Sequence, residues 1–305
     1  MARVPIDQVR EALHARAAAL GFVDARAARL ADHFLDAELR GASGHGVERM
    51  RWLHGLGGLQ TEAAAVETDR SEGYVRYDGG GALGYLALAE VLERELAEPP
   101  AGARLVVVAD CFPTGRLGYF AEMGSRTGLV TLLSATSTPR IVHPQGGPPV
   151  TGTNPICLAV PGDPPTLVDV SMGAVTYGAV LKAAATGRAM PDGTLLRGDG
   201  RPETDPAEVI ADRAGIMPFG GPLAHKGFAL ALLVEVLCRS LAGGTGHAAV
   251  ALLARPGADG MAGLRPLLGG RRVPGDSGAA RLTEARRSGT VEVPDDLWAW
   301  LARSH

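Results

Sequence analysis

The chain has 305 residues, of which 46% are hydrophobic and 21% are charged, a composition typical of soluble globular proteins. Its formal net charge is −3 and no basic cluster stands out, which argues against a nucleic-acid partner. No apolar run reaches the ~18 residues of a membrane span. The N-terminus carries acidic residues where a signal peptide needs an apolar run, so we expect no membrane association.

The three cysteines, Cys111, Cys157 and Cys238, are scattered and show no CxxC spacing. This pattern predicts neither a disulfide framework nor a cysteine zinc site, and it fits the reducing cytoplasm. The histidines show no metal-ligand spacing, so we predict no metal site. Lysine is rare, since only Lys182 and Lys226 occur among the 30 basic residues.

The first 40 residues are predicted to form helices, with no strand before them. One helix begins at Pro5 and ends near Gly21, and a second runs from Asp24, a plausible N-cap, to Gly41. A third helix is expected after His45. Because helices come first, this region is not a dinucleotide-binding βαβ unit.

From residue 73 onward the pattern alternates between strands and helices. Residues 74–81 are predicted to form a strand and a turn, and the other predicted strands are 103–110, 129–136, 157–161, 166–172 and 247–254, with a turn at 162–165. The predicted helices are 82–98, 118–128, 226–242 and 294–304. Residues 187–206 are rich in Gly, Pro and Asp and predict a long surface loop that could contain a hairpin.

This order indicates a middle domain inserted between two ends that pack together. We expect residues 76–221 to form a cofactor-binding type of domain. Residues 1–75 and 222–305 would together form a helical domain for dimerisation and for the substrate side of the site.

His45 lies between two glycines, where the helical pattern stops. Its ordinary pKa is near neutrality, so it can exchange a proton at working pH, and the glycines could let a substrate come close. Arg49, one helical turn further on, is well suited to bind a carboxylate. The alternative is that His45 only caps a helix.

Thr153 and Asn154 directly precede Pro155, which favours an extended conformation at Asn154. Their side chains could then project as donors towards a carboxylate or an amide. The alternative is an ordinary turn that enters a strand.

Asp169 falls inside an apolar strand, where an unpaired carboxylate is costly. A histidine would be a natural partner, because the carboxylate would fix its tautomer and favour its protonated form. The alternative is an aspartate at the end of a strand that faces water.

Residues 220–226 bring two glycines, His225 and Lys226 to the start of a helix, an arrangement that can bind phosphate. The alternative is an ordinary loop with an exposed lysine. The common motifs GxxxxGK[ST], HExxH and GxSxG are absent from the sequence, and its glycines at 79–84 do not follow GxGxxG.

Six segments, taken in order, resemble the malate/L-lactate dehydrogenase family of unusual, non-Rossmann fold: RGASGHGVERM, GPPVTGTNPICLAVP, LVDVSMGAV, RPETDP, FGGPLAHKGFALALLVEVL and VPGDSG. The resemblance runs from about residue 5 to about residue 282. It implies an α/β fold with a mainly antiparallel mixed sheet, an N-terminal helical layer and a homodimer. It also implies an NAD(P)-dependent oxidoreductase that uses NADPH or NADH on small 2-oxo, 2-hydroxy or cyclic 2-imino acids.

The resemblance also implies roles for single residues. His45 matches the proton donor, Asp169 the acid that orients it, and Arg49 the arginine that binds the substrate carboxylate, with Thr153 and Asn154 nearby. The residues expected around the cofactor are Thr114, Gly115, Arg116, Gly118, Gly152, Ser171, Lys226, Gly275 and Asp276.

The chain departs from the family pattern mainly near the cofactor. Gly44 stands where the family usually has serine, Pro113 where it has histidine, and Met172 and Gly173 where it has polar residues. The segment between residues 254 and 273 is also short. We therefore predict weak or lost dinucleotide binding. Two alternatives follow, a lyase, isomerase or cyclase that keeps His45, and a non-catalytic protein that binds a small carboxylate.

Overall fold

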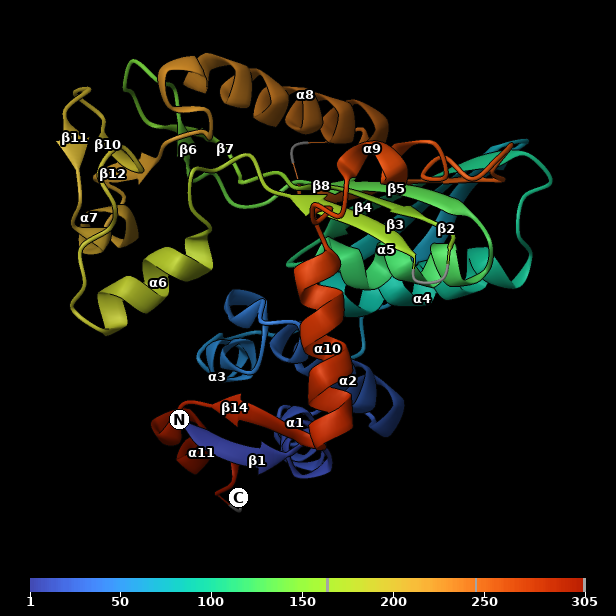
Figure 1. Ribbon diagram of the computed structural model, residues 1–305, viewed down its shortest axis with the longest axis horizontal. Coiled ribbons are helices and arrows are strands. Elements are labelled where there is room, and N and C mark those ends of the chain that lie inside the picture. Colours follow the sequence, from blue (N-terminus) through green and yellow to red (C-terminus); the bar gives the residue numbers. More distant parts are fainter. Residues whose placement is uncertain (163–164, 245, 304–305) are drawn as a thin grey trace.

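The computed structural model describes residues 1–162, 165–244 and 246–303. Its centre is a seven-stranded sheet in the order β2-β3-β4-β13-β5-β8-β9 (Figure 1). The β3–β4 pair is parallel and the other neighbouring pairs are antiparallel. This arrangement confirms the expected mixed α/β fold with a mainly antiparallel sheet. The strands are β2 (Val66–Ser71), β3 (Tyr74–Ala82), β4 (Ala103–Cys111), β5 (Val130–Ala135), β8 (Ile156–Val160), β9 (Thr166–Val170) and β13 (Ala248–Ala254).

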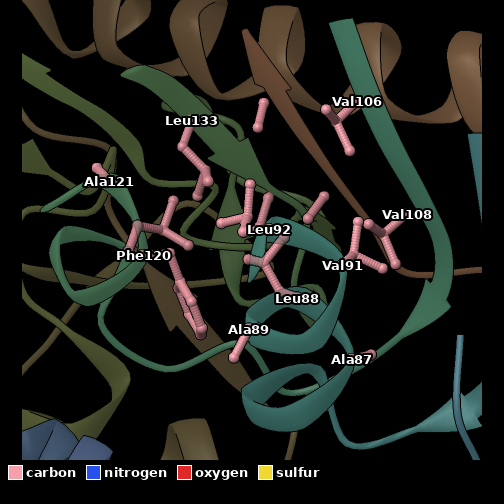
Figure 2. Packing of buried hydrophobic residues seen from close by; sticks show 14 of the residues in the cluster. Ala87, Leu88, Ala89, Val91, Leu92, Val106, Val108, Phe120, Ala121 and Leu133 are labelled. Atoms are coloured by element: carbon pink, nitrogen blue, oxygen red, sulfur yellow. The ribbon is translucent and has the colours of Figure 1, made fainter. Parts of the chain in front are cut away.

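Both faces of this sheet are covered, because side chains alternate along each strand. On β4, Val106 and Val108 face α4 (Gly84–Ala97) and α5 (Leu117–Arg126), whereas Val107 faces α8 (Ala224–Ala242). Figure 2 shows the first of these cores, in which Leu88 and Leu92 of α4 and Phe120 of α5 meet the sheet. Each such buried side chain contributes about 1.5–3 kcal/mol from the removal of apolar surface from water.

A second core joins the two ends of the chain. β1 (Ala2–Pro5) pairs with β14 (Thr290–Val293), next to α1 (Ile6–Ala19) and α11 (Asp295–Leu301). The other elements of this layer are α2 (Asp24–Leu39), the 3-10 turn η1 (Ser43–His45), α3 (Glu48–His54) and α10 (Asp276–Ser288). The short α9 (Leu264–Leu268), which precedes α10, lies away from this layer and near β9, where Arg265 donates to Thr166 (Figure 1). The expected first three helices are confirmed, but the expectation that no strand precedes them is wrong. Val4 of β1 is buried against this layer, and its pairing with β14 could not be read from a four-residue segment.

A five-stranded sheet in the order β11-β10-β12-β6-β7 lies to one side of the central sheet (Figure 1). It carries α6 and α7 around a small core of Val180, Leu195, Val209 and Ile216. The predicted hairpin within residues 187–206 is confirmed by the β10–β11 pair. The elements are β6 (Ile141–Val142), β7 (Pro149–Thr151), α6 (Tyr177–Ala185), β10 (Leu195–Arg197), β11 (Pro202–Glu203), α7 (Pro206–Ile210), β12 (Ala214–Ile216) and the 3-10 turn η2 (Gly221–Leu223).

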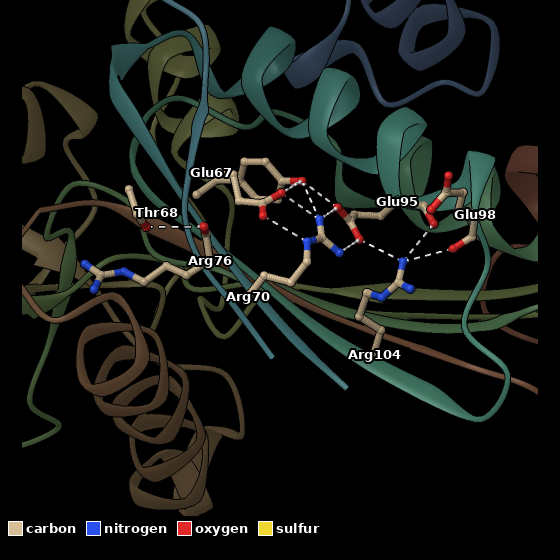
Figure 3. A network of polar contacts seen from close by, with 8 residues as sticks. Glu67, Thr68, Arg70, Arg76, Glu95, Glu98 and Arg104 are labelled. Atoms are coloured by element: carbon tan, nitrogen blue, oxygen red, sulfur yellow. Dashed lines mark hydrogen bonds and ion pairs between the residues drawn. The ribbon is translucent and has the colours of Figure 1, made fainter. Parts of the chain in front are cut away.

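A polar network fixes the exposed edge strand β2 to the sheet (Figure 3). The Glu95 side chain is only 1% exposed, and its carboxylate pairs with Arg70 (2.6 Å) and Arg104 (2.8 Å). Burial alone would raise the pKa of Glu95, but the hydrogen bonds from Arg70 and Tyr77 lower it below its ordinary value. All residues of β2 are exposed, and the ion pair of Arg70 with Glu95 connects this strand to α4.

The division into domains at residues 75/76 and 221/222 stays a prediction. β3 crosses the first of these positions, and β13, from the C-terminal part of the chain, joins the central sheet. The predicted turn at 162–165 lies partly outside the described residues. The three cysteines are free and buried.

Candidate active site

One cavity of about 500 Å³ brings together side chains from distant parts of the chain. Much of its wall is formed by η1, α3, the loop 112–116 and the first residue of α5. The segments 136–140 and 176–178 and the end of β9 complete it. The residues predicted to act on the substrate that line this cavity are His45, Arg49, Thr153 and Asp169.

His45 lies in a turn that is shaped by close approaches at its glycines. A Cβ on Gly46 would lie 2.0 Å from Oε2 of Glu38, and that oxygen accepts a hydrogen bond from the backbone N–H that precedes α3 (2.9 Å). A Cβ on Gly178 of α6 would lie 3.0 Å from Cα of Gly44. The glycines therefore let Glu38 and α6 approach the turn, rather than only leaving room for a substrate as expected.

The environment of His45 favours its neutral form. The side chain is half-buried, and its pKa is lowered to about 4, first by the loss of water around the ring and then by the nearby cations Arg49 and Arg116. At neutral pH the imidazole is therefore ready to accept a proton. An anion that offsets those cations would raise this pKa and so favour the protonated form, which can donate.

Arg49 keeps donors available towards the cavity. Its Nε donates to the carbonyl oxygen of Gly44 (2.8 Å), and its guanidinium carbon lies 5.3 Å from the centre of the Trp52 ring. Within residues 1–162, 165–244 and 246–303, no carboxylate pairs with it. The contacts hold the side chain in place and leave its terminal nitrogens for an anion, which is the arrangement a carboxylate-binding arginine requires.

Asp169 lines the same cavity but does not hydrogen-bond to His45 in the described structure. Its Oδ2 instead accepts the N–H of Gly118 at the start of α5 (2.9 Å). The carboxylate keeps an exposed surface in the cavity, yet the surrounding protein removes enough water to raise its pKa, against the opposing effects of Gly118 and Arg116. The direct pairing expected between Asp169 and His45 is thus replaced by a bond to the backbone of α5.

The predicted donors Thr153 and Asn154 have different surroundings. Thr153 lines the cavity, and its N–H donates to Oγ of Ser137 (3.1 Å). Asn154 is fully buried, and its Nδ2 donates to Glu235 (2.7 Å) and to the backbone of α8. Its φ is +35°, so the extended conformation predicted from Pro155 is wrong. Asparagine tolerates this left-handed region, and here its side chain joins α8 to the cavity wall instead of facing a substrate.

The residues predicted around the cofactor fall into two groups. Those that line the cavity are Thr114, Gly115, Arg116, Ser171 and Gly275. Outside its wall, the Gly118 N–H holds Asp169, and a Cβ on Gly152 would lie 2.2 Å from Oγ of Ser137. Asp276 accepts the N–H of Val273 (2.8 Å), and Lys226 is exposed on α8. These four residues have local structural roles or solvent contact in place of the expected cavity contacts.

Arg116, one of the residues expected around the cofactor, is already paired inside the protein. Its side chain is only 8% exposed and pairs with Asp36 (2.7 Å), while its buried Nε has no hydrogen-bond partner within the described chain. Its backbone N–H donates to Nε2 of His33 (3.3 Å). His33 is enclosed by aromatic rings, and burial followed by the charge of Arg116 lowers its pKa to about 3.

The sequence did not indicate several residues of the cavity wall, chiefly Trp52, Tyr85, Phe112, Arg140 and Tyr177. Trp52 follows Arg49 by three positions, so helical spacing could have placed it beside Arg49. Thr176 caps α6 through the N–H of Ala179, and a threonine before an alanine-rich run is a recognisable helix start. Arg140 follows a proline in an irregular segment and carries no local signal.

Comparison with known proteins agrees with this architecture. Residues 4–264 match the family model described as malate/L-lactate dehydrogenase. L-sulfolactate dehydrogenase from Methanothermobacter thermautotrophicus is 29% identical over 282 residues, which are 88% of this chain and 80% of that protein. The (2R)-3-sulfolactate dehydrogenase (NADP(+)) from Chromohalobacter salexigens is 32% identical over 215 residues, 68% of this chain and 63% of that protein. The crystal structure of delta1-piperideine-2-carboxylate reductase from Pseudomonas syringae has a TM-score of 0.84 at 25% identity, covering 99% of both chains.

The fold and the cavity define an α/β enzyme with a mainly antiparallel sheet, whose cavity holds a histidine and an arginine that pairs with no carboxylate of the described residues. The chain belongs to the malate/L-lactate dehydrogenase family, whose named members above are dehydrogenases and a reductase of small acids. It is therefore an oxidoreductase of that family.

Proposed function

We propose that this chain is an NAD(P)-dependent dehydrogenase or reductase that acts on a small 2-oxo, 2-hydroxy or cyclic 2-imino acid. The observation that carries the proposal is the presence of His45 and Arg49 in one cavity, with Arg49 unpaired within the described chain. The names of the relatives, which include sulfolactate and piperideine-2-carboxylate, support an acid of this size.

In this proposal Arg49 binds the carboxylate next to the reacting carbon. Its terminal nitrogens can form two parallel hydrogen bonds with the two carboxylate oxygens, which fixes the orientation of the acid. Thr153, in the same wall, adds a hydroxyl that can donate to a substrate oxygen.

His45 moves the proton at the substrate oxygen or nitrogen. When a 2-hydroxy acid is oxidised, neutral His45 accepts the hydroxyl proton. When a 2-oxo or 2-imino acid is reduced, His45 donates that proton back. The substrate carboxylate assists the second direction, because it offsets the Arg49 charge that lowers the pKa of His45.

The cavity residues suit part of a nicotinamide dinucleotide, which when bound would supply or accept the hydride at carbon 2. Thr114, Gly115, Arg116, Ser171 and Gly275 would hold it, and the unpartnered buried Nε of Arg116 is consistent with a missing acceptor. Pro113 offers no N–H to it. We propose that the dinucleotide binds weakly, since each missing hydrogen bond to a charged phosphate costs about 1.5–3 kcal/mol.

Calorimetric titration with NADH and NADPH, followed by turnover assays on a panel of 2-oxo and cyclic 2-imino acids, tests the proposal. We expect weak dinucleotide binding and reduction of at least one acid, with loss of turnover in His45→Gln. Low-micromolar binding of either dinucleotide would contradict the weak-binding part. Conversion of an acid without dinucleotide would support a lyase, isomerase or cyclase, and carboxylate binding without any turnover would support a binding protein.

We also propose a homodimer, through a surface other than the one the sequence suggested. The apolar face of the N-terminal helices, on which the prediction rested, is covered by β1, β14, α10 and α11. α8 instead exposes large apolar side chains, namely Leu230, Leu232, Leu233, Val236 and Leu237. A second copy would cover this face. We expect light scattering to give a dimer for the wild type and a monomer for Leu233→Asp, and a wild-type monomer would contradict the proposal.

The location of the protein is proposed to be the cytoplasm, which the free buried cysteines support. One helix within the described residues, Gly221–Ala242, is long and apolar enough to cross a membrane by length and composition. Helices of this kind also occur as core helices, and α8 packs one face on the sheet through Ala231, Val234 and Cys238. We therefore propose no membrane partner and no nucleic-acid partner.

A further inference from the structure

Four arginines line the cavity, namely Arg40, Arg49, Arg116 and Arg140. They differ in whether a carboxylate inside the protein already balances their charge. Arg40 and Arg116 share the carboxylate of Asp36, at 3.0 Å and 2.7 Å, and Arg40 also pairs with Glu122 at 2.7 Å. Both arginine side chains are only 8% exposed. Carboxylates inside the protein already balance their charges, so they attract a second acidic group of a substrate less strongly than an arginine whose partner lies in water.

Arg140 is different, because its acidic partner is largely in water. It pairs through one terminal nitrogen with Asp212, whose side chain is 71% exposed, whereas Arg140 itself is 18% exposed. An ion pair with so exposed a carboxylate contributes about 0–1 kcal/mol. An anion that enters the cavity can therefore replace Asp212 at small cost.

Two further contacts hold Arg140 towards the cavity. Its guanidinium carbon lies 4.7 Å from the centre of the Tyr177 ring, and both side chains line the cavity. Its Nε is buried and has no hydrogen-bond partner within the described residues. Stacking on Tyr177 thus fixes the guanidinium plane, while a buried donor remains unsatisfied, which is the condition a bound acceptor would relieve.

The position of Arg140 relates it to the substrate side of the cavity. Tyr177 begins α6, and the next residue, Gly178, contacts Gly44 in the turn that carries His45. The cavity residues expected at the dinucleotide come from other segments, 114–116, 171 and 275. Arg140 therefore lies on a wall continuous with His45 and Arg49, which makes a substrate group a better occupant than a phosphate of the dinucleotide.

We propose that Arg140 determines specificity by binding a second acidic group of the substrate. The substrate would then be a small 2-oxo or 2-hydroxy acid with a carboxylate or sulfonate at its other end, held by Arg49 at one end and Arg140 at the other. This inference rests on the proposed function. It goes further by selecting doubly charged acids over singly charged and cyclic ones.

A matched pair of acids tests this, 2-oxobutanedioate against 2-oxobutanoate, which differ by a carboxylate in place of a methyl group. Binding is measured by calorimetry in the presence of NADP⁺, which cannot reduce a 2-oxo acid, and turnover is measured separately by the oxidation of NADPH. We expect the wild type to prefer the dianion by at least about tenfold, the value of one charge-assisted hydrogen bond, and Arg140→Gln to lose that preference. Arg140→Lys should restore part of it. Arg49→Gln should weaken the binding of both acids.

Two neighbouring variants serve as controls. Arg213→Gln removes an exposed arginine that pairs with Glu208, outside the cavity wall, and should change nothing. Asp212→Asn removes the competing carboxylate and should keep or strengthen dianion binding. Equal binding of the two acids by the wild type would overturn the inference while leaving the proposed function intact. The inference would also be overturned if Arg140→Gln weakened only the binding of NADPH. If the folded protein reduced neither kind of acid, the result would count against both proposals.

Discussion

Replacement of Arg49 by glutamine should weaken substrate binding and change the titration of His45 together. The variant removes the terminal nitrogens that face the cavity, and a charge-assisted hydrogen bond to a carboxylate contributes about 1.5–3 kcal/mol. KM for a 2-oxo acid should therefore rise about tenfold to a hundredfold. Burial, followed by the charges of Arg49 and Arg116, lowers the pKa of His45 to about 4, so removal of the Arg49 charge should move that pKa upward by part of this shift. Steady-state kinetics and an NMR titration of His45 measure the two effects.

Arg51→Gln is the matched control for this variant. Arg51 lies on the same helix, but it pairs with Glu48 (2.8 Å) and Asp296 (3.0 Å) outside the cavity. It should leave both KM and the His45 titration unchanged. The reasoning is refuted if Arg49→Gln raises only KM for the dinucleotide, or if the pKa of His45 stays where it is.

Three other predictions concern the chemistry of the site and the stability of the protein. His45→Gln should lower kcat by about a hundredfold or more, because it removes the side chain proposed to move the proton, and an unchanged kcat would disprove that role. His33 is neutral in the folded protein with a pKa of about 3, so its contribution to stability is present above pH 6.5 and is lost as the pH falls from there towards 3. Urea unfolding should show His33→Gln to be less sensitive to acid than the wild type, by on the order of 4 kcal/mol near pH 3, and parallel curves would disprove this. Glu122→Ala breaks a buried pair with Arg40 and should cost about 3 kcal/mol of unfolding free energy, whereas Glu284→Ala, at an exposed pair with Arg287, should cost under about 0.5.

The parts of the fold that local patterns encode were predictable. The alternation of valines in β4 and the apolar run of α8 both follow from the periodicity of strands and helices. Short elements were not predictable in this way. β1 has four residues and β6 has two, and such segments form only because distant partners, β14 for the first and β7 and β12 for the second, supply their hydrogen bonds.

The site was predictable where residue type alone indicates chemistry. His45 and Arg49 are four residues apart, so one turn of chain brings both to the same cavity. Asn154 shows the limit of such reasoning, because Pro155 argued for an extended backbone while contacts with Glu235 and Ala231, about 80 residues away, hold it at positive φ. Arg140 enters the cavity by tertiary packing on Tyr177, which no local spacing reveals.

The pairing of charges around the cavity links substrate binding to proton transfer. Asp36 and Glu122 balance Arg40 and Arg116 before any ligand enters, but no carboxylate of the described chain balances Arg49. Burial of the ring is the largest cause of the low pKa of His45, and the charge of Arg49 lowers it further; a substrate carboxylate can offset this second effect. Binding of the acid and protonation of His45 must then favour each other, since such coupling between two binding events is reciprocal. A substrate without a carboxylate would lose its hold on Arg49 and, at the same time, the charge that allows His45 to deliver a proton.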